Sequence, residues 1–258
     1  MLKYLLSTAE FLEEEGGLGL LEKALALVDA SRREKALGIR HIEARAASLG
    51  GGLLLQLALR EARSIRPWGG GNLDAESRMP HRELVRLCPS RLLERLEEGP
   101  PLPLAFRHGP GGKPYLTEYP FYFNLSHSGR YVVCALGLEE MGVDIQVHRE
   151  KGEREVLRTR SIARRFFTAS ETEALGAAGA DREALELFYR LWARKEAYGK
   201  LTGGGVGDAL GVNLLTLPER TPEGRVLVWE EYGDIPDCSL AICSFRPQDL
   251  SKRQILPS

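Results

Sequence analysis

Residues 189–207 have the sequence YRLWARKEAYGKLTGGGVG, and the rest of the chain can be arranged around this stretch. Trp192, Glu196 and Lys200 are spaced four residues apart, so a helix would place an aromatic ring, a carboxylate and an amine on one face. The glycine run that follows predicts the end of this helix. Taken alone, the stretch fits either an amphipathic helix with a weak Glu–Lys pair or a helix face that carries out chemistry.

The composition argues against several classes of protein. The chain has 258 residues, of which 43% are hydrophobic, and this is enough for one large domain or two small ones. Its 35 basic and 36 acidic residues balance, so the net charge gives no support for a nucleic-acid partner. No apolar run approaches the roughly 18 residues of a membrane span, and the first residues lack the apolar core of a signal peptide. The four cysteines form no C-x-x-C pair, so we expect buried free thiols in a soluble, cytoplasmic protein that has no membrane partner.

Apolar residues at helical spacing predict that residues 19–65 are mostly helical. A basic run within this region fits either a solvated helix face or an edge that faces phosphate: Arg32, Arg33, Lys35, Arg40, His41 and Arg45. The triplet Gly50 to Gly52 follows, and each glycine inside a helix costs about 1 kcal/mol relative to alanine. We therefore expect close packing at this triplet.

Loop and helix signals alternate in the next part of the chain. We expect a loop over 66–80, a helical segment over 81–98 with a break near Pro89, and a Pro- and Gly-rich segment over 99–120. The last segment contains GGKP, in which Lys113 is either an exposed turn lysine or a lysine that a loop presents to an anion.

Strand signals begin at FYFNLSHSGRYVVCALGL, residues 121–138, where two apolar runs flank a small polar turn. His127 lies among hydroxyl groups and is either a structural residue or a ligand-binding one. The strand-like segment MGVDIQV follows at 141–147, with Asp144 and Gln146 alternating with apolar residues. Asp144 is therefore a candidate metal ligand, although the polar face of an edge strand is an equally complete explanation.

The C-terminal part predicts helices and then strands. A basic helix is expected to end at Phe167, and Thr168 or Ser170 would cap a helix that has Glu171 in its first turn, which fully explains that glutamate in structural terms. Three strands are expected at 212–217, 225–232 and 238–245. Each half of the chain thus contains basic helical residues, a helix meeting a glycine triplet, and strands. We expect two similar α+β halves, over 1–138 and 139–258, with a cleft between them.

Three motifs now combine: FNLSHSG at 123–129, GVDIQ at 142–146, and W-x-x-K-E-A-x-x-K at 192–200. Together with RFFTASE between the second and third, they resemble the 4′-phosphopantetheinyl transferases of the surfactin-synthetase-activating type, over roughly residues 20–210. The resemblance implies an α+β fold of two pseudo-symmetric α/β halves with the active site in the cleft. It also implies an enzyme that moves the phosphopantetheine arm of coenzyme A onto a serine hydroxyl of an acyl or peptidyl carrier protein and releases adenosine 3′,5′-bisphosphate.

The same resemblance assigns roles at a metal and a catalytic site. Asp144 and Glu196 match metal carboxylates, for which Mg²⁺ is the expected ion because it prefers oxygen ligands. Glu196 would also accept the serine proton, and Lys200 would hold the phosphate and support the leaving group. Glu171 matches a further acid near the metal. Gln146 stands where many relatives carry a glutamate ligand, and the neutral amide should weaken or rearrange metal binding.

Coenzyme binding is assigned in the same way. Ser126 and His127 match residues that contact the coenzyme's phosphates, together with Asp144 and Lys200, and Lys113 matches a lysine at the nucleotide phosphates. Relatives usually carry an arginine for the 3′-phosphate where this chain has Ala47. Arg45 is no equivalent, because two positions along a helix correspond to a rotation of about 200°.

Two alternatives remain beside the transferase. A degenerate relative could bind coenzyme A or a carrier protein without catalysis, which the glutamine and alanine substitutions above would favour. An unrelated phosphohydrolase could use Asp144, Glu171 and Glu196, but it would not account for the other motifs. The basic segment 158–165 is a candidate contact for an acidic carrier helix. Because both halves of the cleft lie in one chain, we expect a monomer.

Overall fold

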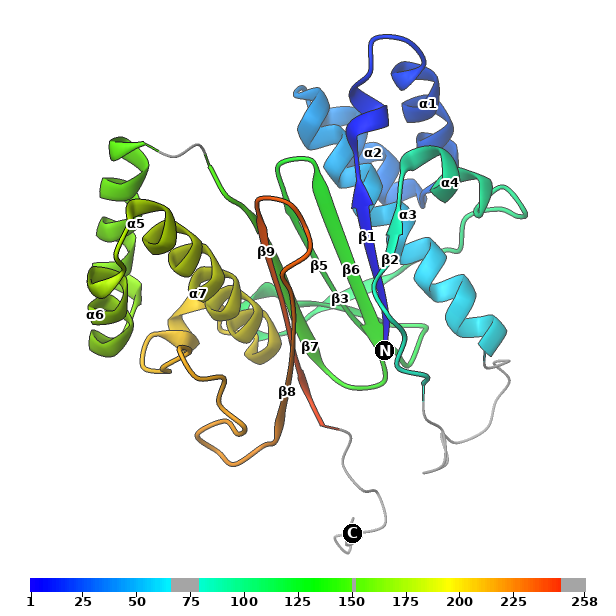
Figure 1. Cartoon of the computed structure of the whole chain (residues 1–258). Coiled ribbons are helices and arrows are strands. Elements are labelled where there is room, and N and C mark those ends of the chain that lie inside the picture. The colour runs from blue at the N-terminus through cyan, green and yellow to red at the C-terminus, as the bar shows by residue number, and fades with distance from the viewer. Residues whose placement is uncertain (66–78, 150–151, 247–258) are drawn as a thin grey trace, which may run out of the picture.

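Two β-sheets lie next to each other at the centre of the molecule, and helices cover the outer face of each (Figure 1). The computed structural model describes residues 1–65, 79–149 and 152–246. The first sheet has the order β2-β1-β6-β5 and consists of β1 (Leu2–Ser7), β2 (Val85–Leu87), β5 (Tyr122–Ser128) and β6 (Tyr131–Gly137). The second sheet has the order β7-β9-β8 and consists of β7 (Met141–Val147), β8 (Leu227–Tyr232) and β9 (Cys238–Phe245). This arrangement confirms the predicted α+β class.

The first sheet carries the N-terminal helices on its outer face. These are α1 (Gly17–Leu27), α2 (Ala30–Gly38), α3 (Ile42–Ile65) and α4 (Pro89–Glu94), with the short 3₁₀ helix η1 (Ala9–Leu12). The long helix α3 packs on β6 and β1. Its leucines join Leu6, Cys134 and Leu136 of these strands in one hydrophobic cluster. The mostly helical region predicted over 19–65 is therefore confirmed.

The second sheet carries the C-terminal helices in the same manner (Figure 1). These are α5 (Glu153–Phe166), α6 (Ala169–Ala177) and α7 (Asp181–Thr202), followed by the 3₁₀ helix η3 (Gly205–Ala209). Trp192 of α7 stacks with Phe188 and meets Phe166 edge to face, so its ring anchors α7 to α5. A separate hairpin of β3 (Phe106–His108) and β4 (Pro114–Leu116), joined by η2 (Pro110–Gly112), completes the elements of the described residues.

The inner faces of the two sheets share a third hydrophobic cluster. Buried residues of β1 and β6 meet buried residues of β7 and β9 there: Leu5, Val133 and Ala135 on one side, and Val143, Ile145, Leu240 and Ile242 on the other. Burial of apolar area at this contact stabilises the pairing of the two sheets by about 25 cal/mol per Å². Each sheet therefore has one face for its own helices and one face for the other sheet. The boundary at 138/139 coincides with the connection between β6 and β7, and the division into domains stays a prediction.

Side chains of β5 also bind the backbone of β7. Alternate residues of β5 accept hydrogen bonds from alternate backbone N–H groups of β7: Val143 N to Asn124 Oδ1 at 2.9 Å, Ile145 N to Ser126 Oγ at 3.4 Å, and Val147 N to Ser128 Oγ at 3.0 Å. Both partners repeat every two residues because successive strand residues point to opposite faces. The N-L-S-H-S motif thus aligns β5 with the G-V-D-I-Q motif through its small polar side chains.

Glycines mark the places where elements approach most closely. A Cβ atom on Gly142 of β7 would lie 1.9 Å from the carbonyl oxygen of Ala197, so α7 lies directly against this strand. In α3, a Cβ atom on Gly50 would lie 2.8 Å from a methyl group of Leu6, and one on Gly52 would lie 2.9 Å from Cγ of Arg32. Close packing at the first glycine triplet was predicted and is confirmed.

Two expected elements are wrong. The segment 81–98 is not helical before Pro89, because Val85–Leu87 pairs in parallel with β1. The expected break near Pro89 is confirmed, since Pro89 is the first residue of the short helix α4. The segment 212–217 is not a strand, because side chains of α6 and α7 bind its backbone in place of a neighbouring strand. The two glycine triplets also differ, since the first lies inside α3 and the second follows α7.

The remaining expectations concern the thiols, the loop and the membrane. Cys134, Cys238 and Cys243 are buried and free, as expected, and Cys88 is partly buried and free. The loop expected over 66–80 falls almost wholly outside the described residues. Within the described residues, no helix combines the length and the apolar character that a bilayer crossing requires.

Candidate functional site

The carboxylate of Asp144 is the centre of a buried polar cluster between β5, β7 and α7. Asp144 is 2% exposed. Its Oδ1 accepts hydrogen bonds from Lys200 Nζ at 2.6 Å and from Ser126 Oγ at 2.8 Å. Its Oδ2 accepts one from Gln146 Nε2 at 2.7 Å. The structure therefore brings together four residues from three separate sequence motifs.

Lys200 joins the helix to both strands. Besides Asp144, its Nζ donates to Ser126 Oγ at 3.0 Å and to the carbonyl oxygen of Val143 at 3.1 Å. The glycine at position 142 allows this approach, because it lets the backbone of α7 touch β7. The Lys200 side chain is 28% exposed, unlike the buried Asp144 beside it, and it forms part of the pocket lining described below.

Glu196 lies one helical turn before Lys200 on the same face of α7. Burial raises the pKa of Glu196, the negative charge of Asp144 raises it further, and Lys200 opposes both effects. Among the described residues, none donates a hydrogen bond to this carboxylate. Glu196 is therefore a carboxylate with free lone pairs and a neighbouring negative charge, which is the situation that a cation or a proton relieves.

A pocket of about 510 Å³ opens beside this cluster. Its walls come from α2, the β3–β4 hairpin, β5 and the C-terminal end of α7. Four cationic side chains line it: Arg32, Lys35, Lys113 and Lys200. Asp29 is the one acidic residue in the lining that the described residues provide, and its side chain caps α2 by accepting from the backbone N–H of Arg32 at 3.0 Å. The pocket is thus suited to an anionic ligand.

Two glycine segments form one wall of the pocket. Gly111 has a φ of 72°, and a Cβ atom there would lie 1.8 Å from the carbonyl oxygen of Gly203. A Cβ atom on Gly199 would similarly lie 2.1 Å from the carbonyl oxygen of Gly205. The GGK loop and the glycine run after α7, which are far apart in the sequence, therefore touch backbone to backbone.

Lys113 is held at this wall. Its Nζ donates to the carbonyl oxygen of Leu201 at 2.9 Å, and Glu140 lies 3.9 Å away. Burial lowers the pKa of Lys113, and the charge of Glu140 opposes that shift. A buried lysine with one carbonyl partner gains a further favourable contact when an anion enters the pocket.

The basic run before α3 contributes through Arg32 and Lys35. The side chain of Arg32 lines the pocket and packs against α3 at Gly52. A larger residue at position 52 would displace the Arg32 side chain. In the sequence these two cations belong to a basic run of six residues, and nothing in the run distinguished them from the other four. The available signal was their separation of three residues on one helix, which places both on the same face.

The position expected to carry an arginine in relatives is buried away from the pocket. Ala47 is 5% exposed and belongs to the cluster between α3 and the first sheet. Arg45 donates from Nε and Nη2 to the carbonyl oxygen of Ile39 at the end of α2. Neither Ala47 nor Arg45 lines the pocket. The positive charge of the pocket therefore comes from the four cationic side chains named above.

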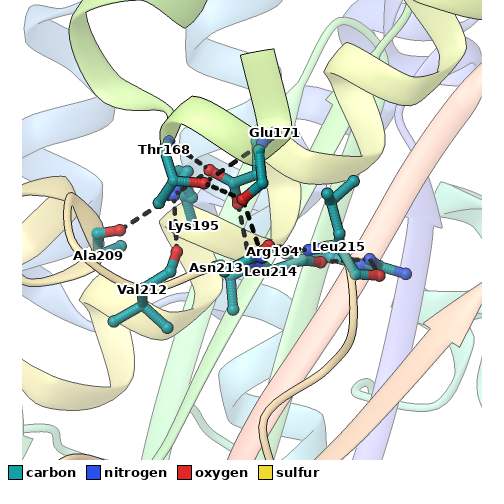
Figure 2. A network of polar contacts seen from close by, with 10 residues as sticks. Thr168, Glu171, Arg194, Lys195, Ala209, Val212, Asn213, Leu214 and Leu215 are labelled. Atoms are coloured by element: carbon teal, nitrogen blue, oxygen red, sulfur yellow. Dashed lines mark hydrogen bonds and ion pairs between the residues drawn. The ribbon is translucent and has the colours of Figure 1, made fainter. Parts of the chain in front are cut away.

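Two predicted residues lie outside the cluster. His127 is exposed near the end of β5 and is not part of the pocket lining. Glu171 is fully buried at the start of α6, where Thr168 caps the helix as predicted. Its carboxylate binds Lys195 and two backbone N–H groups (Figure 2). We therefore do not include Glu171 among the candidate metal ligands.

The remaining donors fit a hard divalent cation. Asp144 and Glu196 supply carboxylate oxygens, and Gln146 supplies an amide oxygen while its nitrogen binds Asp144. Within the described residues there is no group of three or more His, Cys, Asp or Glu side chains that could hold a metal ion. The fit thus rests on two carboxylates and one amide, which suits an ion that keeps several waters or ligand oxygens, as Mg²⁺ does.

A cationic pocket whose lining includes Lys200, the partner of the buried Asp144, is suited to a phosphorylated ligand, and the neighbouring carboxylates suit a hard cation. Comparison with known proteins makes the class specific. A model of the 4′-phosphopantetheinyl transferase superfamily matches residues 140–239. A 4′-phosphopantetheinyl transferase of Bacillus subtilis is 27% identical over 234 residues, which cover 88% of this chain and 86% of that protein.

Further relatives agree with this match. The AcpT 4′-phosphopantetheinyl transferase of Escherichia coli strain K12 is 34% identical over 146 residues, which cover 56% of this chain and 68% of that protein. The Sfp 4′-phosphopantetheinyl transferase of Bacillus subtilis strain 168 is 32% identical over 147 residues, which cover 53% of this chain and 61% of that protein. The chain belongs to the 4′-phosphopantetheinyl transferase superfamily and is a transferase of that class, as its motifs predicted.

Proposed function

We propose that the chain transfers the 4′-phosphopantetheine group of coenzyme A to a serine hydroxyl of an acyl or peptidyl carrier protein. The observation that carries this proposal is the contact between Lys200, which lines the cationic pocket, and the buried carboxylate of Asp144. Glu196 lies one helical turn before Lys200 on the same face of α7. The superfamily match and the names of the relatives support the same reaction. Both sides of the pocket come from a single chain, which supports a monomeric enzyme.

Coenzyme A is a multiply charged anion, and the pocket offers it four cations. We assign the nucleotide phosphates to Arg32, Lys35 and Lys113, and the pyrophosphate to Lys200. Charge-assisted hydrogen bonds of this kind are roughly twice as strong as neutral ones. The partial apolar lining by Phe106 and Phe123 offers contact area for the remainder of the ligand.

Asp144, Glu196 and Gln146 would hold Mg²⁺ through their side-chain oxygens. When bound, the ion supplies positive charge that offsets the charge of the pyrophosphate. The remaining chemistry is assigned to residues of the chain. Ser126 orients Asp144 by donating to its Oδ1, and the amide of Gln146 orients the same carboxylate from the other side.

Glu196 is the proposed proton acceptor. The serine oxygen forms a bond to the phosphorus that carries pantetheine, and the bond from this phosphorus to the bridging oxygen breaks. The serine proton passes to Glu196, directly or through a water molecule, and the bridging oxygen leaves with adenosine 3′,5′-bisphosphate. The carboxylate of Glu196 suits this role, because within the described residues no donor occupies its oxygens. Lys200 stabilises the negative charge that develops on the oxygens.

The test is the mass of a carrier protein after incubation with the chain, coenzyme A and Mg²⁺. We expect a gain of one phosphopantetheine on the apo carrier and no gain with the Asp144→Asn variant. Coenzyme A binding measured by calorimetry is the parallel readout. Binding without transfer to any of several acyl and peptidyl carriers would support a degenerate coenzyme-binding protein, which Gln146 and Ala47 would favour, and would overturn the transferase proposal.

A further inference from the structure

Lys195 stands directly before Glu196 on α7 but belongs to a different network, in which Lys195 and Glu171 are fully buried (Figure 2). Its Nζ donates to the carbonyl oxygens of Ala209 and Val212, both at 3.0 Å. The same atom lies 2.9 Å from Oε2 of Glu171, and both side chains are 0% exposed. The lysine therefore uses its three donors within the protein and has no surface for a ligand.

Glu171 is equally committed. Its Oε2 also accepts from the backbone N–H of Thr168 at 2.7 Å, and its Oε1 accepts from the backbone N–H of Leu214 at 2.8 Å. The backbone N–H of Glu171 in turn donates to Thr168 Oγ1 at 3.3 Å, which completes a capping box at the start of α6. One buried carboxylate thus joins α6, α7 and the segment 209–215.

Arg194 binds the same segment from the adjacent position on α7. Its Nη1 donates to the carbonyl oxygens of Leu214 and Leu215, and its Nε and Nη2 pair with both oxygens of Glu231 at 2.8 and 2.7 Å. Charged side chains therefore bind four carbonyl oxygens and one N–H group of residues 209–215, in place of a neighbouring strand. Hydrogen bonds to charged groups are stronger than those between neutral groups, which explains why this segment is ordered without strand partners.

The network connects directly to the pocket wall. Gly205 lines the pocket and begins η3, and Ala209, whose carbonyl oxygen Lys195 binds, ends η3. Gly205 also touches Gly199 of α7. Because one short 3₁₀ helix separates the two points, fixing Ala209 fixes the position of Gly205 relative to α7.

We propose that Glu171 and Lys195 are positioning residues that hold the glycine wall of the pocket against α7, and that Glu171 is not a metal ligand. The identity of the pocket's ligand as coenzyme A rests on the proposed function; the positioning of the wall does not. Removal of one partner alone would leave an unpaired buried charge and risks unfolding the protein. The neutral pair Glu171→Gln/Lys195→Met removes both charges and keeps the side-chain lengths.

The test compares this double variant with Arg182→Gln/Glu186→Gln, which removes an exposed ion pair on the same helix. Amide hydrogen exchange over 203–215 measures how firmly the glycine wall is held. Calorimetry measures the affinity for coenzyme A, and titration with Mn²⁺ measures the affinity of the cation site. For the neutral pair we expect exchange at Leu214 to be at least about tenfold faster, coenzyme A binding to be weaker by about tenfold, and Mn²⁺ affinity to stay within about twofold of wild type. The exposed-pair variant should match wild type in all three.

Unchanged exchange over 203–215, or a Mn²⁺ affinity lowered by about tenfold or more, would overturn the positioning role. Failure of the wild-type protein to bind coenzyme A would overturn the proposed function instead, and hydrogen exchange would still decide the role of Glu171 and Lys195. A Glu171→Gln single variant that folds and keeps its Mn²⁺ affinity would support the proposal independently, since a lost carboxylate ligand must weaken metal binding.

Discussion

Lys200 Nζ lies 2.6 Å from Asp144 Oδ1, although 56 positions separate the two residues in the chain. The contact joins α7 to β7 and places the amine beside a carboxylate that is 2% exposed. It exists because Gly142 lets the helix backbone touch the strand. In the proposed reaction, this pair connects the cation site to the phosphate site.

Removal of the Lys200 amine should affect turnover more than coenzyme binding. In Lys200→Met we expect kcat to fall by about 10²–10³, because a charge that stabilises the transition state is lost. The KM for coenzyme A should rise by less than about tenfold, since the other three cations of the pocket remain. Steady-state kinetics with an apo carrier measures both. A kcat within threefold of wild type would refute the assigned role, by the usual reading of mutant kinetics.

Arg32 and its neighbour Arg33 form a matched pair. Arg32 lines the pocket, whereas Arg33 donates to the carbonyl oxygens of Leu25 and Ala26 on the outside of the N-terminal helices. Arg32→Gln should raise the KM for coenzyme A by about tenfold with little change in kcat, because a phosphate contact is lost equally from ground state and transition state. Arg33→Gln should leave the KM unchanged. If both substitutions raised the KM equally, the two arginines would act through the overall positive charge of the protein, and the proposed contact of Arg32 with a phosphate would be wrong.

The close contact at Gly142 predicts a sensitive position. Gly142→Ala would place a Cβ atom 1.9 Å from the carbonyl oxygen of Ala197, so α7 must move away from β7. We expect a loss of about 1–3 kcal/mol in the free energy of unfolding, together with loss of transfer activity. Gly19→Ala in α1 is the control, because nothing lies within 4 Å of a Cβ atom there, and it should gain about 1 kcal/mol. Denaturant unfolding of both variants checks the contrast.

The ion pair between Lys3 and Glu230 connects β1 to β8 and should make stability depend on pH. Burial alone would raise the pKa of Glu230, but the hydrogen bond and charge of Lys3, at 2.5 Å, and the nearby His81 outweigh it and lower the pKa. A carboxyl whose pKa is lowered by folding stabilises the protein above its unfolded value of 4.5 and loses that contribution as the pH falls through the folded value. Glu230→Gln should therefore cost about 2 kcal/mol at pH 7.

The difference between wild type and Glu230→Gln should begin to shrink as the pH falls below 4.5. It should disappear below the lowered pKa of the folded protein, where the wild-type carboxyl is neutral as well. Urea unfolding at a series of pH values measures this convergence. A difference that stays constant from pH 7 to pH 3 would show that packing, rather than charge, connects the two strands at this point.

Much of the candidate site follows from the sequence because its residues lie in motifs with regular spacing. The alternation in GVDIQ predicted that Asp144 and Gln146 share a face, and helical spacing predicted the same for Glu196 and Lys200. The structure adds the contact between the two faces. That contact depends on the backbone of residue 142 and was not visible in the spacing.

Other features could not be predicted because tertiary contacts override local preference. The segment 85–87 is a strand only because β1 offers it a parallel edge. The apolar run at 212–217 has the composition of a strand, yet Arg194, Lys195 and Glu171 satisfy its backbone groups. For Glu171 the helix-cap pattern in the sequence predicted the contacts that the structure shows. The family resemblance instead predicted a position near the metal.

The carrier mass after incubation with Glu196→Gln tests the central claim most directly, because this variant removes the proposed base and keeps the shape of the site. With coenzyme A, Mg²⁺ and an apo carrier, wild type should add one phosphopantetheine to the carrier. Glu196→Gln should bind coenzyme A within about threefold of wild type and leave the carrier at its apo mass. Transfer by the variant at the wild-type rate would contradict the account.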